Sequence, residues 1–140
     1  MPLWTVFHPL DAFTFDQKAA LTADITKIYT DFGLPKFYVG VVYIPIPKES
    51  FFIGAKPVDN FIRVKVDHIA RTLPTPEIRK WWVETTDAQL KSHIADRGFD
   101  FEWHIDETPF DLWSIQGIPP PPGGSEAEKL WIEGNKPVKY

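Results

Sequence analysis

The 140-residue chain contains no cysteine, and this absence excludes disulfide bonds, a thiol nucleophile and metal sites built on thiolates. There is no excess of positive charge, because 15 lysines and arginines are outnumbered by 19 aspartates and glutamates, which gives a net charge of −4. Proteins that bind nucleic acids present a basic surface. We therefore expect no nucleic-acid partner.

Long hydrophobic runs are also missing. The longest apolar stretch, from Phe37 to Pro47, is too short to cross a bilayer and contains three breakers. The N-terminus lacks the basic start and the apolar core of a signal peptide. These absences predict a soluble, cytoplasmic protein with no membrane partner.

Cofactor and metal signatures are absent as well. The sequence has no phosphate-binding loop, dinucleotide fingerprint or G-x-S-x-G elbow, so we expect no cofactor. His104 and Asp106 would face one side of a strand, but no second histidine stands at ligand spacing, and we expect no metal site. His8 and His68 alternate with apolar neighbours, as is typical of structural histidines whose hydrogen bonds are satisfied.

Apolar residues make up 44% of the chain and aromatic residues 15%, which predicts one folded domain over residues 1–140. Its first half, residues 1–58, has strand, helix, strand and hairpin patterns, in the order Leu3–His8, Thr14–Phe32, Lys36–Pro47 and Ser50–Ala55. Thr14 and Gln17 fit a capping box, and Gly33 stops the helix.

The second half, residues 59–108, repeats the pattern, with a strand, a helix and a closing strand over Asn60–Ala70, Thr75–Gly98 and Phe99–Asp106. Thr75 and Pro76 fit the cap and first turn of a helix. A further capping pattern in Glu84–Asp87 could interrupt that helix.

Two tandem βαβ units predict an α/β (α+β) fold with a four-stranded sheet and both helices on one face. The other sheet face is left open and needs a partner. Residues 109–140 form a C-terminal arm with four consecutive prolines and a short helix near Ser125–Glu133. Its tryptophans are costly to expose, so the arm should pack on the body or on a neighbouring subunit.

Pro2 directly follows the initiator methionine, at the start of the first predicted strand. Methionine before a small residue is usually removed, and Pro2 would then carry a secondary amine that can act as a base, an acid or a nucleophile. The alternative is structural, because proline is tolerated at the first position of a strand.

An N-terminal proline on a doubled βαβ chain of this length resembles the tautomerase superfamily, in particular the cis-3-chloroacrylic acid dehalogenase-like branch and its fungal relatives. Five ordered stretches carry the resemblance: MPLWTVFHP, LTADITKIYT, FFIGA, VKVDHIART and FEWHIDETPF. The resemblance covers nearly the whole chain, and it implies a homotrimer.

The resemblance also implies site residues. Pro2 matches the catalytic proline, and Arg71 matches an arginine that binds the substrate carboxylate, a task that suits its planar fork. Tyr29 stands where the dehalogenase has a histidine, and His104 stands where it has a tyrosine.

Two of the dehalogenase's residues are missing from this chain. Pro74 replaces its second arginine, and Ile115 replaces its water-activating glutamate, although Asp106, Glu107 or Asp111 could substitute for that carboxylate. Tautomerisation needs only a base, a cation and a hydrogen-bond donor to the enolate oxygen. We therefore expect a cofactor-independent tautomerase that acts on a small 2-oxo or unsaturated carboxylic acid. A hydratase or hydrolytic dehalogenase of 3-haloacrylate-like acids, and a non-catalytic oligomer on the same scaffold, are the alternatives.

Overall fold

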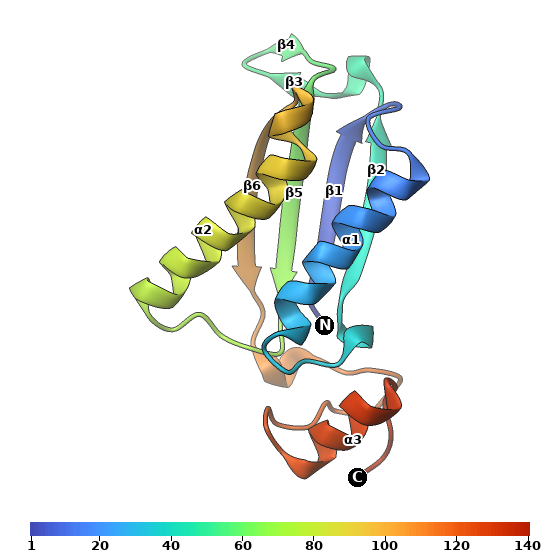
Figure 1. The fold of residues 1–140 in the computed structure, drawn as a ribbon, viewed down its shortest axis with the longest axis vertical. Helices are drawn as coiled ribbons and strands as arrows, with labels where there is room; N and C mark the ends of the chain where they lie inside the picture. Colours follow the sequence, from blue (N-terminus) through green and yellow to red (C-terminus); the bar gives the residue numbers. More distant parts are fainter.

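The computed structural model describes residues 1–140, and a four-stranded sheet in the order β2-β1-β5-β6 forms its centre (Figure 1). The strands are β1 (Leu3–Pro9), β2 (Gly40–Ile46), β5 (Phe61–His68) and β6 (Asp100–Glu107). β1 and β2 are parallel, β5 and β6 are parallel, and β1 and β5 are antiparallel. The two predicted βαβ units are confirmed.

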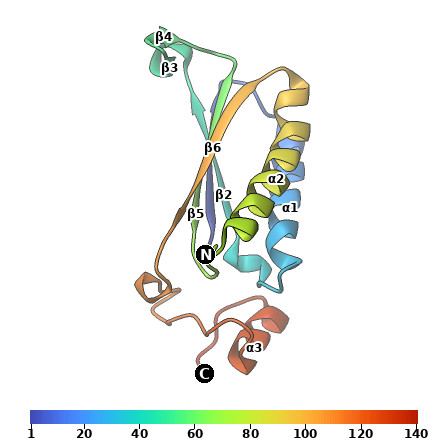
Figure 2. The same cartoon turned by 90° about the vertical axis from the view of Figure 1, so that its left-hand side faces the viewer.

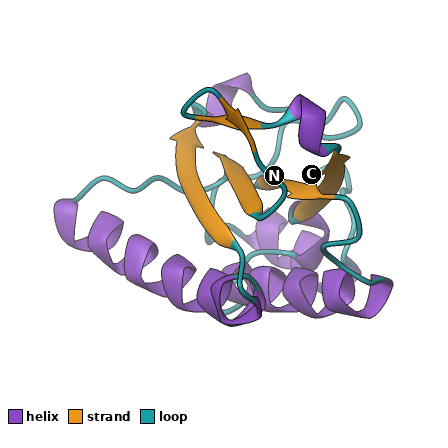
Figure 3. Ribbon diagram, turned by 90° about the horizontal axis from the view of Figure 1, so that it is seen from above, coloured by secondary structure: helices purple, strands orange, loops and turns teal.

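The long helices α1 (Phe15–Thr30) and α2 (Pro76–His93) both cover the same face of this sheet (Figures 2 and 3). Thr14 and Gln17 form the expected capping box, and Thr75 caps α2 with Pro76 in its first turn. The interruption that the Glu84–Asp87 pattern allowed does not occur: the helix is continuous, and Thr86 in the middle of it is fully buried. Packing onto the sheet therefore outweighs the local capping signal.

The core lies between these helices and the sheet, because alternate residues of each strand point toward the helices. On the two central strands these are Trp4, Val6, Ile62, Val64 and Val66, all fully buried. Leu21, Ile25 and Leu90 meet them from the helices. The opposite sheet face has no covering layer in this chain (Figure 2).

The second strand is shorter than predicted. Lys36–Tyr38 forms a 3-10 turn, η1, and the strand begins only at Gly40. The Tyr38 ring is buried and contacts the rings of Trp113 and Trp131 from the C-terminal arm. The turn therefore packs against the arm instead of extending the strand.

The arm carries the helix α3 (Glu126–Gly134), capped by Ser125, and lies beyond the end of the sheet near the N-terminus (Figure 1). Trp131 is fully buried, and its indole N–H donates to the Val138 carbonyl at 2.8 Å. Of the two places proposed for the arm, packing on its own body is the one observed.

The small hairpin of β3 (Phe52–Ile53) and β4 (Lys56–Pro57) extends from the opposite end of the molecule (Figure 1). Three further single-turn 3-10 helices complete the chain: η2 (Lys48–Ser50), η3 (Ala95–Arg97) and η4 (Phe110–Leu112). None of the helices is long and apolar enough to span a membrane.

Candidate active site

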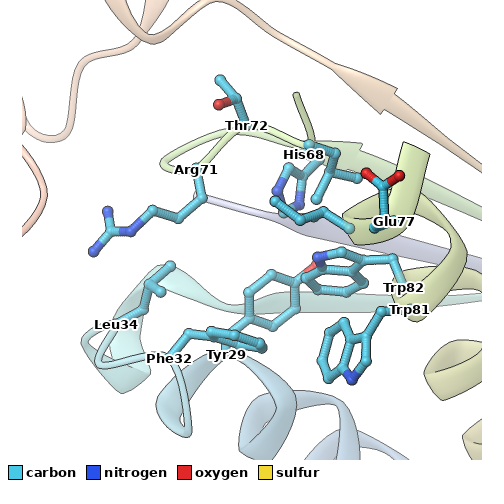
Figure 4. A pocket seen from close by; sticks show the side chains of 11 residues that line it. Tyr29, Phe32, Leu34, His68, Arg71, Thr72, Glu77, Trp81 and Trp82 are labelled. Carbon is cyan, nitrogen blue, oxygen red and sulfur yellow. The ribbon is translucent and has the colours of Figure 1, made fainter. Parts of the chain in front are cut away.

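A cavity of about 530 Å³ opens where α1 and β5 end and α2 begins (Figure 4). Seven of its eleven lining residues are hydrophobic, and Arg71 is its only lysine or arginine. The lining includes Tyr29, His68, Arg71, Trp81 and Trp82. An apolar wall with few polar groups and a single cation suits a small organic anion.

Pro2 is buried at the start of β1, and its carbonyl accepts the Gly40 N–H at 2.9 Å. The antiparallel register pairs Leu3 with Asp67, which places Pro2 next to His68 at the end of β5. With Met1 attached, burial lowers the pKa of the Met1 amine to about 4. The chain therefore brings its terminus into a desolvated place beside the cavity.

Tyr29 faces this same region from α1. Its hydroxyl accepts the indole N–H of Trp4 at 3.0 Å, and its ring lies 5.9 Å from His68 and 5.3 Å from Trp82, between ring centroids. Burial raises the pKa of Tyr29, so the phenol stays protonated at neutral pH and is suited to donate a hydrogen bond.

Arg71 lines the cavity, but its guanidinium extends away from His68 (Figure 4). Its Nη2 donates to both carboxylate oxygens of Glu128 at 3.0 Å, and its Nη1 donates to the Ala70 carbonyl at 2.9 Å. A Cβ at Gly123 would lie 2.8 Å from the Arg71 Cζ, so a larger residue there would require the guanidinium to move. The arm thus holds the guanidinium that is predicted to bind the substrate. The sequence did not reveal this contact between the arm and Arg71.

His104 is not brought to this cavity. It pairs with Lys65 across β5 and β6, on the open sheet face, whereas Trp103 and Ile105 point to the helix side. Its Nδ1 accepts from Arg63, and its Nε2 lies 3.3 Å from Asp106. Within one chain, the structure therefore groups Pro2, Tyr29 and Arg71 and leaves His104 on the other side of the sheet.

His68 is the cavity residue that sequence reasoning missed. Its side chain is 1% exposed, and neither ring nitrogen has a hydrogen-bond partner, so the expectation of a satisfied structural histidine was wrong. Burial lowers its pKa, and the nearby Glu107 carboxylate partly opposes that shift. The one feature of the sequence that could have indicated its place in the site is its position, three residues before Arg71.

The three carboxylates considered as substitutes lie in different places. Asp106 is on the open face beside Lys65, and Asp111 is exposed in η4. Glu107 pairs with His68 in the strand register, and its Oε2 accepts the N–H of Leu73 in the cavity wall at 3.1 Å. Glu107 is therefore the one of the three that lies next to the cavity.

The tandem βαβ units and the proline at position 2 agree with the tautomerase class. The family model described as "Putative oxalocrotonate tautomerase enzyme" matches residues 1–136. The chain belongs to this family.

Solved structures agree with this membership. RhCC from Rhodococcus jostii RHA1 is 46% identical, with a TM-score of 0.96 over 99% of each chain. A probable enzyme from the thermophilic fungus Aspergillus fumigatus is 39% identical, with a TM-score of 0.95 over 100% of this chain and 98% of that chain.

A more distant structure shares the fold alone. It is N1, a member of the cis-3-chloroacrylic acid dehalogenase family, 15% identical with a TM-score of 0.76 over 95% of this chain and 97% of that chain. No curated protein matches the chain significantly.

Proposed function

We propose that this protein is a tautomerase that uses the Pro2 amine, freed by removal of Met1, on a small 2-oxo or unsaturated carboxylic acid. The observation that carries the proposal is the buried terminus beside a largely apolar cavity that also holds a tyrosine and one guanidinium. These groups supply the base, the donor and the cation that a keto–enol interconversion requires.

The amine acts best as a base when its pKa lies near the working pH. Burial disfavours the charged form of an amine, and the same desolvation lowers the pKa of the Met1 amine in the unprocessed chain. Pro2 would therefore be neutral for a larger share of the time than an exposed secondary amine. This favours proton abstraction from carbon over protonation of the substrate.

Arg71 would bind the substrate carboxylate at one end of the cavity, while Tyr29 would donate to the developing enolate oxygen. The Arg71 guanidinium still has donors that no protein group accepts, because its Nε makes no hydrogen bond and Nη1 makes one. Aromatic side chains, including Trp81 and Trp82, line the remaining wall and exclude water.

A hydratase or dehalogenase remains the second candidate because of Glu107. Its carboxylate borders the cavity, and only Oε2 is engaged by the Leu73 amide. A carboxylate there could activate a water molecule. Ile115 and Pro74 still stand where the resemblance requires a carboxylate and a second cation, so we expect little or no halide release from 3-chloroacrylates.

We propose that the active form is a homotrimer. The open sheet face is apolar on β1 and β2 and ionic on β5 and β6, and the hairpin exposes Phe52 and Ile53. A fused 4-OT protein with a related fold, 16% identical with a TM-score of 0.68 over 84% of this chain and 94% of that chain, is described as an asymmetric trimer. His104 lies on this open face, so it could reach an active site only in a neighbouring subunit of such an assembly.

The decisive experiment joins intact mass with kinetics. The purified protein should lack Met1 and should convert phenylenolpyruvate to its keto form. Pro2→Ala should lower kcat by about 10²- to 10⁴-fold without unfolding the protein. Full activity in a form that retains Met1 would contradict the mechanism. Absence of turnover on enol acids and haloacrylates, with Met1 removed and the trimer intact, would favour the non-catalytic alternative.

A further inference from the structure

His68 is buried beside the cavity, and neither of its ring nitrogens has a protein partner. It is the last residue of β5, its ring contacts Trp82 edge-on at 5.3 Å between centroids, and it lines the cavity (Figure 4). A buried polar group without a partner costs about 1–3 kcal/mol of stability. Because both ring nitrogens lack a protein partner, the natural partner is a ligand in the cavity.

The surroundings of His68 determine the protonation state of its ring. The groups that face it are the chain terminus on β1, Tyr29 on α1 and Glu107 on β6, with Trp82 on α2. Burial lowers its pKa, and the Glu107 carboxylate opposes that shift only in part. The ring is therefore neutral at pH 7, with one N–H donor and one acceptor nitrogen.

We propose that His68 is a catalytic residue of this site, whose neutral ring N–H donates to the substrate oxygen that becomes negative during proton transfer. This inference rests on the proposed function. In the keto-to-enol direction, the Pro2 amine takes a proton from the carbon beside the keto group, and that C–H electron pair forms the C–C double bond. The C=O pair moves to oxygen, which receives the same proton from the amine, so the reaction is balanced and His68 ends neutral.

Tyr29 and His68 would form a pair of donors around one oxygen. Their rings lie 5.9 Å apart between centroids, and Trp4 fixes the Tyr29 hydroxyl on the terminus side. Two preorganised donors stabilise an oxyanion more than one does, and removal of one such donor costs about 10²–10³-fold in kcat.

The test compares three substitutions of His68. His68→Phe keeps an aromatic ring against Trp82 but removes the donor, and it should lower kcat by about 10²–10³-fold with little change in KM. His68→Asn and His68→Gln place an amide N–H near Nδ1 and Nε2, respectively. One of these two variants should have a kcat at least about tenfold higher than that of His68→Phe. That variant would identify the ring nitrogen that donates.

His8 provides a matched control, because it is also buried on the helix-facing side of the sheet but lies at the far end of β1. His8→Phe should leave kcat unchanged. Full activity of His68→Phe would overturn the inference while leaving the proposed function intact.

A binding measurement separates the two hypotheses. Phenylglyoxylate is a 2-oxo acid that has no enolisable hydrogen, so it reports binding without turnover. At saturation it should shift one ring nitrogen resonance of His68 and leave His8 unchanged. If the protein is inactive but shows this shift, the proposed tautomerase function is refuted while the contact between His68 and the ligand stands. If the His68 resonance does not move, the contact is refuted.

Discussion

At the scale of single residues, the polar groups of the cavity are kept in defined protonation states by burial. The phenol of Tyr29 has a raised pKa and already accepts one hydrogen bond, from Trp4. It is therefore a donor that needs no reorganisation when an oxyanion develops. His68, which is also buried, is held neutral in the same way.

We expect Tyr29→Phe to lower kcat by about 10²-fold and to leave KM nearly unchanged, because the lost hydrogen bond is strongest in the transition state. Tyr43→Phe is the matched control, since burial also raises the pKa of Tyr43 and its hydroxyl bonds Thr22 and the Lys18 carbonyl away from the cavity. Steady-state kinetics with phenylenolpyruvate measure both. An equal loss in the two variants would contradict a specific role for Tyr29.

Acid should destabilise the fold through His8 and His68. Both have a pKa below the ordinary value of 6.5, so the unfolded chain takes up protons that the folded chain does not. The contribution of these histidines to the free energy of unfolding is fully present above pH 6.5. Below that pH it decreases, by up to about 1.4 kcal/mol per pH unit for each histidine. The free energy of unfolding can be measured by urea denaturation of wild type and His68→Phe between pH 5 and about 7.5. Plotted against pH, it should have a smaller slope in the variant. Identical slopes would mean that His68 is not held neutral.

At the scale of elements, α3 links the arm to the cavity. The buried carboxylate of Glu128 accepts from Arg71 and from the Gly124 N–H, so one side chain ties the helix start to the cation. Gly123 permits this close approach. The position of Arg71 is therefore set by a segment more than 50 residues away in sequence.

We expect Arg71→Ala to raise KM by about ten- to hundredfold, because a charge-assisted contact worth about 1.5–3 kcal/mol is lost. Glu128→Ala should raise KM by a smaller factor, since the guanidinium remains but is no longer held, and it should also lower the free energy of unfolding. Glu126→Ala, at an exposed position in the same helix, should change neither. A lower KM in Glu128→Ala would show instead that Glu128 competes with the substrate.

At the scale of the whole molecule, the uncovered sheet face and the projecting hairpin call for an assembly. Val42, Phe52 and Ile53 are each more than 40% exposed. The long helices and the arm also expose large apolar side chains, among them Phe15, Leu112 and Leu130, so an assembly could cover these surfaces as well. Sedimentation should report about three chains, and a stable monomer at micromolar concentration would contradict the proposed trimer.

Subunit mixing tests whether His104 serves a neighbour. Pro2→Ala and His104→Ala should each be weakly active alone. If each site takes Pro2 from one subunit and His104 from the next, random reassembly of equal amounts should restore about a quarter of wild-type activity. Activity that does not rise on mixing would place His104 outside the catalytic machinery.

Sequence patterns alone determined the two βαβ units and the caps of the helices. These features depend on local periodicity and on side chains a few residues apart, such as Thr14 and Gln17. The sequence also pointed to Pro2 and Arg71, through residues at fixed places in ordered stretches.

Tertiary structure alone decided the rest. Strand register put His104 on the open face and His68 on the cavity side, although both stand on strands of alternating pattern. Packing kept α2 continuous, and long-range contact joined Glu128 to Arg71. Such contacts join residues far apart in the chain, and a local pattern cannot tell which groups will meet when one face of a sheet is buried.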